Sequence, residues 1–161
     1  MGLDTETQEG EPAGPLAAYR ALRRGGNLRH DAGQLLAAEK LQSLHNALRG
    51  YRPAGNGGWK ERLGLGRRKT EPPQGLYVFG SVGTGKSMLM DLFFTSAPVE
   101  KKRRVHFHAF MQEVQERLHA WRQDPANKGK ADPLPVIGGE LAEEAWLLCF
   151  DEFHVVIIAD A

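Results

Sequence analysis

Hydrophobic and polar positions along the first third of the chain predict two helices. Residues 16–22 follow Pro15 and precede Gly25 and Gly26, which is typical of a short helix with proline in its first turn. A longer helix is predicted after Asp31, a residue suited to an N-cap. Its apolar positions recur every three or four residues and predict one buried stripe: Leu35, Ala38, Leu41, Leu44 or His45, Leu48 and Tyr51.

Further along the chain, the pattern predicts strands alternating with helices. Leu76–Phe79 is a short apolar run suited to a buried strand, and Met88–Phe94 is apolar on nearly all sides, as in a buried helix. The alternation in Arg104–His108 predicts a second strand. The helix predicted next presents one apolar face, formed by Phe110, Val114, Leu118 and Trp121. Its polar residues should face away: Gln112, Glu113, Glu116 and Arg117.

The last part of the pattern completes the expected fold class. Prolines and a glycine predict a loop over residues 123–135, and a short helix over 141–145 precedes a strand at Leu147–Phe150. Strands that alternate with helices indicate an α/β protein with a parallel sheet flanked by helices. We therefore expect an α/β core over residues 75–161, with a helical extension over residues 15–51 in front of it.

Two segments lack the pattern of a packed structure. Residues 1–14 are acidic and nearly without apolar side chains, which predicts a disordered tail. Residues 52–74 are rich in glycine, proline and basic residues. We interpret that stretch as a solvated linker, and the alternative is an arm that binds phosphate or a partner.

Composition excludes several classes of protein. The 161 residues carry a net charge of +1, so no global field attracts nucleic acid or an acidic membrane. The single Cys149 cannot form an internal disulfide and fits a reducing compartment. No apolar run reaches the roughly 20 residues that span a bilayer, and the acidic N-terminus is unlike a signal or transit peptide. We expect a soluble intracellular protein.

One glycine-rich segment indicates nucleotide binding. Gly80-Ser81-Val82-Gly83-Thr84-Gly85-Lys86-Ser87 fits the phosphate-binding pattern G-x-x-x-x-G-K-[ST]. Glycines let successive backbone N–H groups point at phosphate oxygens, and the helix predicted next adds its own N-terminal N–H groups. Lys86 would supply a positive charge to the β- and γ-phosphates, and the Ser87 hydroxyl would bind Mg²⁺.

An acidic pair at the end of the last predicted strand supplies the second candidate element. Asp151 follows the buried run Leu147–Phe150, where an acidic residue suits a Mg²⁺ ligand beside a phosphate loop. The adjacent Glu152 could act as the general base that activates water. The alternative is an ordinary acid at a strand end that faces solvent.

Two other features have simpler interpretations. His106 and His108 are two residues apart, so on one strand they would share a face; we interpret them as ordinary hydrogen-bonded histidines and not as metal ligands. The basic run 101–104 is interpreted as a solvated turn before a strand, with contact to an anionic partner as the alternative.

Three segments of the chain together resemble the ZapE/Afg-one-like AAA+ ATPases. They are residues 73–94, residues 104–111 and residues 147–153, and the segments 14–16 and 44–48 are similar to the N-terminal region of that family. The resemblance implies a P-loop NTPase fold of the AAA+ type and Mg²⁺-dependent ATP hydrolysis. In that family bacterial members are associated with cell division through the FtsZ ring, and mitochondrial relatives with protein quality control at the inner membrane.

The resemblance also implies a setting for the protein. Without a transit peptide the chain is more similar to a bacterial, cytoplasmic member, and the matrix face of the mitochondrial inner membrane is the alternative. FtsZ-type division machinery is the expected protein partner, and the full-length protein is expected to form a homo-oligomer. We expect no nucleic-acid partner and at most peripheral contact with a membrane.

The chain departs from the family pattern in two places. Val156 and Ile157 stand where the family usually has Thr and Asp. The sequence stops at Ala161, whereas family members continue with a sensor-one residue and an arginine finger, and their sensor-one strand lies between the phosphate-loop strand and the acidic strand. We therefore expect an N-terminal fragment that is inactive by itself.

These departures motivate a second functional hypothesis. The chain would then be a nucleotide-dependent adaptor without turnover, similar to a helicase loader or a partner-binding module. A third hypothesis, a kinase for small molecules, fits less well, because the pair Asp151-Glu152 suits activation of water better than transfer to a bound alcohol.

Overall fold

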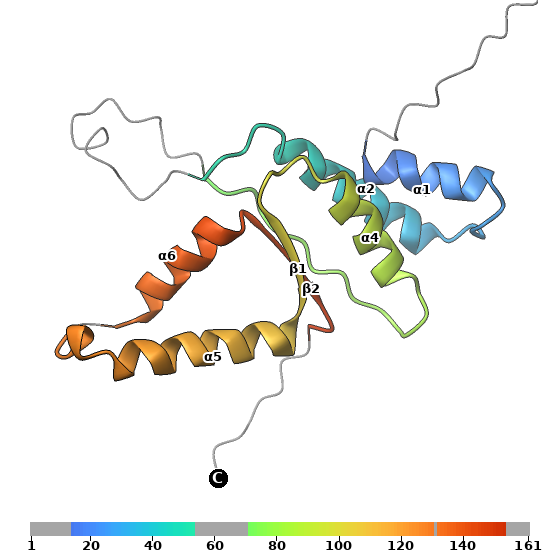
Figure 1. Cartoon of the computed structure of the whole chain (residues 1–161). Coiled ribbons are helices and arrows are strands. Elements are labelled where there is room, and N and C mark those ends of the chain that lie inside the picture. Colours follow the sequence, from blue (N-terminus) through green and yellow to red (C-terminus); the bar gives the residue numbers. More distant parts are fainter. Residues whose placement is uncertain (1–13, 54–70, 131, 154–161) are drawn as a thin grey trace, which may run out of the picture. The chain divides into compact units, whose positions relative to one another are not determined.

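The computed structural model describes residues 14–53, 71–130 and 132–153, and these residues group into two compact units (Figure 1). Unit 1 lies within residues 1–49 and 73–98, and unit 2 within residues 50–72 and 99–161. Each unit is described by itself. The expected acidic tail apart from Gly14, most of the expected linker, and the positions Val156 and Ile157 lie outside the described residues. Within the described ranges, no helix is both long and apolar enough to cross a membrane.

Unit 1 is a group of three packed helices. They are α1 (Pro15–Arg24), α2 (Ala32–Ala47) and α4 (Lys86–Ser96). Their shared core contains these buried side chains: Tyr19, Ala38, Leu41, Leu48, Leu89 and Phe93. His45 of α2 is also buried, and its Nε2 lies 3.0 Å from the backbone oxygen of Ser96 at the end of α4. The burial of Ala38, Leu41 and His45 confirms the predicted stripe on α2.

Local capping explains why α1 and α2 begin where the sequence predicts. Pro15 occupies the first turn of α1, where a missing N–H costs no helical hydrogen bond, and Gly25 follows the last residue. The Asp31 carboxylate accepts a hydrogen bond of 2.9 Å from the backbone N–H of Gln34, as an N-cap does. Both helix starts are confirmed.

The strand predicted at Leu76–Phe79 is wrong for this structure. Residues 71–81 are in neither strand of the described sheet, and the side chain of Phe79 is 82% exposed. A strand exists only where a neighbouring strand satisfies its backbone N–H and C=O groups. The run is apolar enough for a strand, but it pairs with neither strand of the described sheet.

Unit 2 is a two-stranded parallel sheet whose two strands are connected along the chain by helices (Figure 1). Strand β1 (Lys102–His106) pairs with β2 (Leu147–Asp151), with Lys102 opposite Leu147 and His106 opposite Asp151. Helix α5 (Phe107–Gln123), the short 3-10 helix η1 (Pro125–Asn127) and α6 (Leu134–Glu144) connect them. The parallel arrangement confirms the mixed α/β architecture with a sheet flanked by helices.

Several element boundaries in unit 2 differ from the prediction. Strand β1 ends at His106 and α5 begins at Phe107, so His108 lies on a helix and does not share a strand face with His106. The rings of Phe107 and Phe150 meet edge to face, with centroids 5.7 Å apart, which packs the start of α5 against β2. Helix α6 begins at Leu134, inside the predicted loop, because proline is tolerated in a first helical turn.

A network of ion pairs joins three elements of unit 2. Arg103 of β1 is paired with Glu113 of α5. Arg117 of α5 is paired with the same carboxylate at 2.6 Å and makes a bidentate contact with Glu144 of α6 at 2.8 and 2.9 Å. The prediction that Glu113 and Arg117 face away from the fold is therefore wrong. The basic run 101–104 is likewise not a solvated turn, because three of its residues belong to β1 and Arg103 is paired.

Replacing Glu113 by Gln should destabilise unit 2 by about 1 kcal/mol at neutral pH. The hydrogen bond from Arg103, aided by that from Arg117, lowers the pKa of Glu113 from 4.5 to about 2. Its charge therefore stabilises the fold above pH 4.5, and that stabilisation is lost as the pH falls towards 2. Urea denaturation followed by circular dichroism should show a difference between wild type and Glu113→Gln that shrinks over this interval. The exposed Glu116 on the same helix supplies the control, Glu116→Gln, and an equal loss in both variants would contradict a role for the network.

Candidate functional site

The predicted phosphate loop lies in unit 1, directly before α4. Among its glycines, Gly83 and Gly85 have φ values of 81° and 83°, in the left-handed region that glycine adopts without cost. At Gly85 a Cβ atom would also lie 2.9 Å from the side-chain nitrogen of Gln34. The glycines of the motif thus allow both a tight turn and the close approach of α2.

The N-terminus of α4 is suited to bind an anion. Gly85 is its N-cap and supplies no side-chain hydrogen bond, so no side chain caps the first turn. The first N–H groups of a helix have no partner within the helix and carry a partial positive charge. Ser87 is exposed in this turn. An anion such as a phosphate would satisfy these groups.

Lys86 lies over the loop that precedes it. Its ammonium group donates to the backbone oxygens of Gly80 at 2.9 Å and Ser81 at 2.7 Å. The Thr84 hydroxyl also donates to Ser81, at 2.9 Å. Lys86 and Thr84 thus both bond the first residues of the predicted loop, Gly80 and Ser81.

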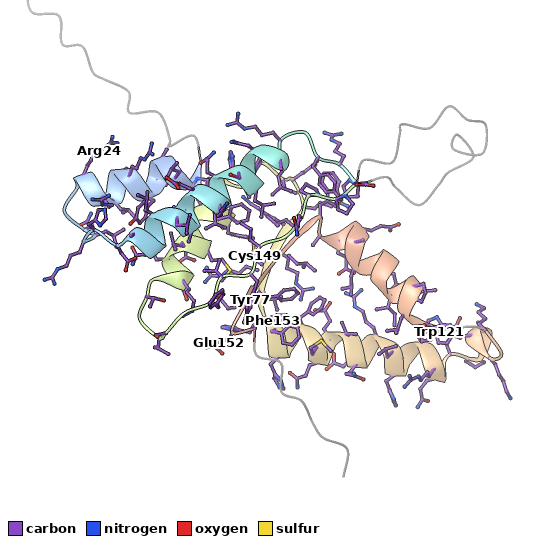
Figure 2. All side chains as sticks on the ribbon, turned by 180° about the vertical axis from the view of Figure 1, so that it is seen from behind. Arg24, Tyr77, Trp121, Cys149, Glu152 and Phe153 are labelled. Carbon is purple, nitrogen blue, oxygen red and sulfur yellow. The ribbon has the colours of Figure 1, made fainter. Side chains whose placement is uncertain are left out.

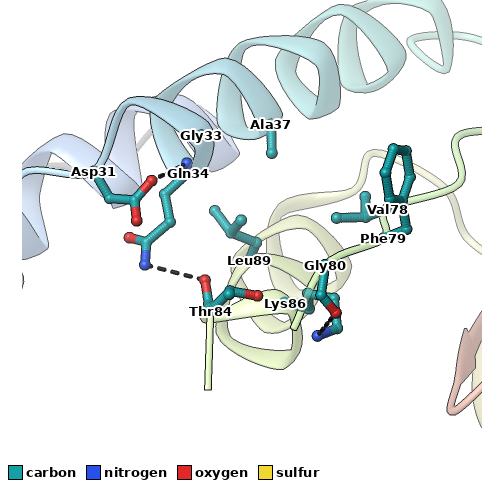
Figure 3. Close-up of a pocket in the computed structure, with 10 residues that line it drawn as sticks. All are labelled: Asp31, Gly33, Gln34, Ala37, Val78, Phe79, Gly80, Thr84, Lys86 and Leu89. Carbon is teal, nitrogen blue, oxygen red and sulfur yellow. Dashed lines mark hydrogen bonds between the residues drawn. The ribbon is translucent and has the colours of Figure 1, made fainter. Parts of the chain in front are cut away.

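A cavity of about 220 Å³ lies between the start of α2 and this loop (Figure 3). Gln34 and Ala37 line it from α2, and Val78, Phe79, Lys86 and Leu89 line it from the segment that contains the loop. The sequence prediction missed the contribution of α2. A signal for it existed, because Gln34 is a polar residue at the spacing of the buried stripe, one turn before Ala38.

The predicted acidic pair lies in unit 2, at the end of β2. Asp151 is the last residue of the strand, and Glu152 and Phe153 follow it directly (Figure 2). Glu152 is exposed and has a φ of 53°, which is uncommon for a residue other than glycine. Backbone conformations of this kind cost energy and cluster at functional sites.

The side chain of Asp151 has a partner that the sequence did not predict. Its Oδ2 accepts a hydrogen bond of 2.7 Å from Nε of Arg104 on β1, and both side chains are partly buried. The interpretation of Asp151 as a strand-end acid that only faces solvent is therefore wrong. The sequence pattern places Arg104 at the start of a strand and in a basic run, and neither feature predicts this partner.

The other candidate metal ligands form no cluster among the described residues. Among the described residues, no group of three His, Cys, Asp or Glu side chains is close enough to hold a metal ion. His106 and His108 are exposed, and Cys149 is buried in β2. Burial raises the pKa of the Cys149 thiol to about 11, so it stays protonated at neutral pH and is a poor nucleophile.

Ser87 and Asp151 supply the kind of atoms that Mg²⁺ binds. A hydroxyl and a carboxylate are hard oxygen ligands, and Mg²⁺ usually takes only one or two protein ligands in addition to phosphate oxygens and water. The carboxylate of Asp151 already lies against a cation, the guanidinium of Arg104. Ser87 of unit 1 and Asp151 of unit 2 thus each offer a hard oxygen ligand, and the Asp151 carboxylate is paired with Arg104.

These features define a mixed α/β protein with a parallel sheet, a glycine-rich loop at a helix N-terminus and an acidic strand end. The family model of the AFG1-like ATPases matches residues 13–161, and the chain belongs to that family. No solved structure matches the chain.

Two relatives show how the similarity is distributed. The cell division protein ZapE of Escherichia coli K12 is 38% identical over 154 residues, which covers 91% of this chain and 40% of ZapE. Lactation elevated protein 1 homolog B of zebrafish is 50% identical over 98 residues, which covers 58% of this chain and 20% of that protein. The chain thus spans less than half the length of the relatives it matches.

Proposed function

We propose that this chain binds ATP through residues 80–87 and, as part of a whole protein of this family, hydrolyses it. The observation that carries the proposal is the ammonium group of Lys86 over a glycine-rich loop, beside a helix N-terminus that no side chain caps. A triphosphate needs both a positive charge and converging N–H donors. Membership of an ATPase family supports ATP as the ligand.

Each predicted site residue has a role in this proposal. The backbone N–H groups of Gly80, Ser81, Val82, Gly83, Thr84 and Gly85 bind phosphate oxygens, and Lys86 contacts the β- and γ-phosphates. Ser87 and Asp151 hold Mg²⁺, which would neutralise charge on the phosphates when bound. Glu152 orients a water molecule and accepts its proton as general base.

The test of this proposal is an ATP titration of the purified chain, with phosphate release measured in parallel. We expect saturable binding that ADP competes for and that inorganic sulfate weakens at high concentration, since sulfate competes for the same N–H donors. Absence of nucleotide binding at any protein concentration tested would overturn the assignment of the loop.

A nucleotide-dependent adaptor without turnover is the second candidate, and the pair Arg104–Asp151 favours it. A carboxylate that stays with a guanidinium at 2.7 Å is less available to Mg²⁺. Bound ATP without release of phosphate, in the chain and in a version extended to the length of its relatives, would support the adaptor over the ATPase.

We further infer a role linked to cell division, supported by the similarity to the cell division protein ZapE. The proposal includes a cytoplasmic location, a partner in the FtsZ-type division machinery and self-association of the whole protein. Co-purification of the division proteins with the tagged whole protein tests the partner, and its absence under conditions of active division would contradict it.

A further inference from the structure

Helix α2 is attached to the phosphate loop by one side-chain hydrogen bond. Nε2 of Gln34 donates to the backbone oxygen of Thr84 at 3.1 Å (Figure 3). A carbonyl oxygen can only accept, so this bond fixes which end of the amide faces the loop. Gln34 is itself held in place, because its backbone N–H donates to the Asp31 carboxylate in the first turn of α2. The loop is therefore attached at Thr84 to a fixed point on a helix.

The bond to Thr84 also fixes the direction of the next N–H group in the loop. The peptide bond between Thr84 and Gly85 is trans and planar, so the C=O of Thr84 and the N–H of Gly85 point in opposite directions. The carbonyl points towards the Gln34 amide, and the N–H of Gly85 consequently points away from it. That N–H is one of the groups proposed to bind phosphate oxygens. Gln34 thus acts on the phosphate loop without contact to the ligand.

This part of the loop gains more from such a restraint than an ordinary segment would. Thr84 lies between Gly83 and Gly85, and glycine has more backbone freedom to lose than any other residue. A loop that samples other conformations must be ordered when its ligand binds, and the entropy lost in that step lowers the affinity. The hydrogen bond from Gln34 orders the peptide before the ligand arrives.

The other end of the Gln34 amide adds nothing to the stability of the fold. Its Oε1 is buried and has no hydrogen-bond partner among the described residues, and an unpaired buried acceptor is costly. An apolar side chain of the same length would avoid that cost. It would lose only the bond to Thr84, which is exposed and can bond water instead. Stability alone therefore does not require glutamine at position 34, whereas the direction of the loop peptide does.

We propose that Gln34 is a positioning residue for phosphate binding, which holds the N–H of Gly85 in the direction of the bound phosphate. This inference rests on the proposed binding of phosphates by the loop. It makes α2 a part of the phosphate site, although the sequence pattern assigns α2 to a separate helical extension.

The test is the variant Gln34→Met, which keeps the length of the side chain and removes the donor together with the unpaired acceptor. In isothermal titration of the purified chain, it should bind ATP about 10-fold more weakly than wild type. It should also bind inorganic tripolyphosphate, which has no base, more weakly by the same factor, because the fixed N–H group serves a phosphate. The unfolding midpoint without ligand, followed by circular dichroism, should not fall.

The matched control is Gln42→Met, the same substitution further along α2. Oε1 of Gln42 accepts a hydrogen bond of 3.2 Å from the backbone N–H of Leu16 at the start of α1, and its Nε2 donates to Asn46 at 3.0 Å. Loss of these bonds should lower the unfolding midpoint and leave the affinity for both ligands within about 2-fold of wild type. The two variants of one helix should therefore show opposite patterns of affinity and stability.

The outcomes separate this inference from the proposed function. If wild type and Gln34→Met bind both ligands equally well, the inference is overturned and the proposed phosphate site stands. Weaker binding of ATP alone would also overturn it, because Gln34 would then act on another part of the nucleotide. If Gln34→Met lowers the unfolding midpoint as much as Gln42→Met does, the residue supports the fold and the inference fails. A wild-type chain that binds neither ligand would overturn both the inference and the proposed function.

Discussion

Replacing Lys86 by Ala should lower the affinity for ATP by about 100-fold, because charge-assisted hydrogen bonds to phosphate are among the strongest polar contacts in proteins. In the structure the ammonium group bonds the backbone oxygens of Gly80 and Ser81. The substitution therefore removes both the positive charge and a link that holds the loop in its curled form. Isothermal titration with ATP measures the first effect directly.

The control for this substitution is Lys40→Ala, which removes an exposed lysine from α2 in the same unit. It changes the net charge by the same amount and should leave the affinity within about 2-fold, since an exposed charge at a distance is screened by salt. Equal losses in both variants would show a general effect of charge. Retained affinity in Lys86→Ala would refute the assignment of the loop as the phosphate site.

Elements whose signals are local could be predicted from the sequence. The start of α2 depends on Asp31 and the N–H of Gln34, three residues apart, and the start of α1 depends on Pro15 itself. Strand β2 was predicted at Leu147–Phe150, one residue short of its end at Asp151. In each case the residues that decide the structure are neighbours in the chain.

Elements that depend on distant partners could not be predicted in the same way. The alternating run Arg104–His108 fits a strand throughout, yet α5 begins at Phe107, whose ring packs against Phe150 far along the chain. The run Leu76–Phe79 is apolar enough for a strand but pairs with neither strand of the described sheet. The alternation of apolar and polar residues shows that a segment is able to form a strand. Whether the strand forms depends on its packing and pairing with distant parts of the chain.

The residues of the candidate site also fall into those that a local motif predicts and those that depend on distant partners. The loop residues follow from one contiguous motif, and the structure places Lys86 over that loop. Gln34 and Arg104 act across the fold, on Thr84 and Asp151 respectively, and neither lies in a recognisable motif. Gln34 could have been suspected as a polar residue on a buried stripe, but a basic residue within a basic run gives no sign of its partner.

Glu152 is the site residue whose role most needs a separate test. It follows β2 directly, is exposed, and has a left-handed backbone conformation at a φ of 53°. This conformation ends the extended backbone of β2 after Asp151. The carboxylate of Glu152 is therefore not placed as it would be if the strand continued. The proposed roles differ, because Asp151 would bind Mg²⁺ and Glu152 would accept a proton from water, so the two side chains need different positions.

In a version of the protein extended to the length of its relatives, Glu152→Gln should reduce ATP hydrolysis by about 10²–10⁴-fold and leave ATP affinity unchanged. Glutamine keeps the size of the side chain and can still orient water, but it cannot accept the proton. Phosphate release under single-turnover conditions and ATP titration measure the two effects separately, and Glu100→Gln, which changes an exposed carboxylate before β1, is the matched control. Undiminished turnover would remove Glu152 from the role of base. An equal fall in affinity would instead show that the side chain supports binding, because loss of a general base acts on the chemical step alone.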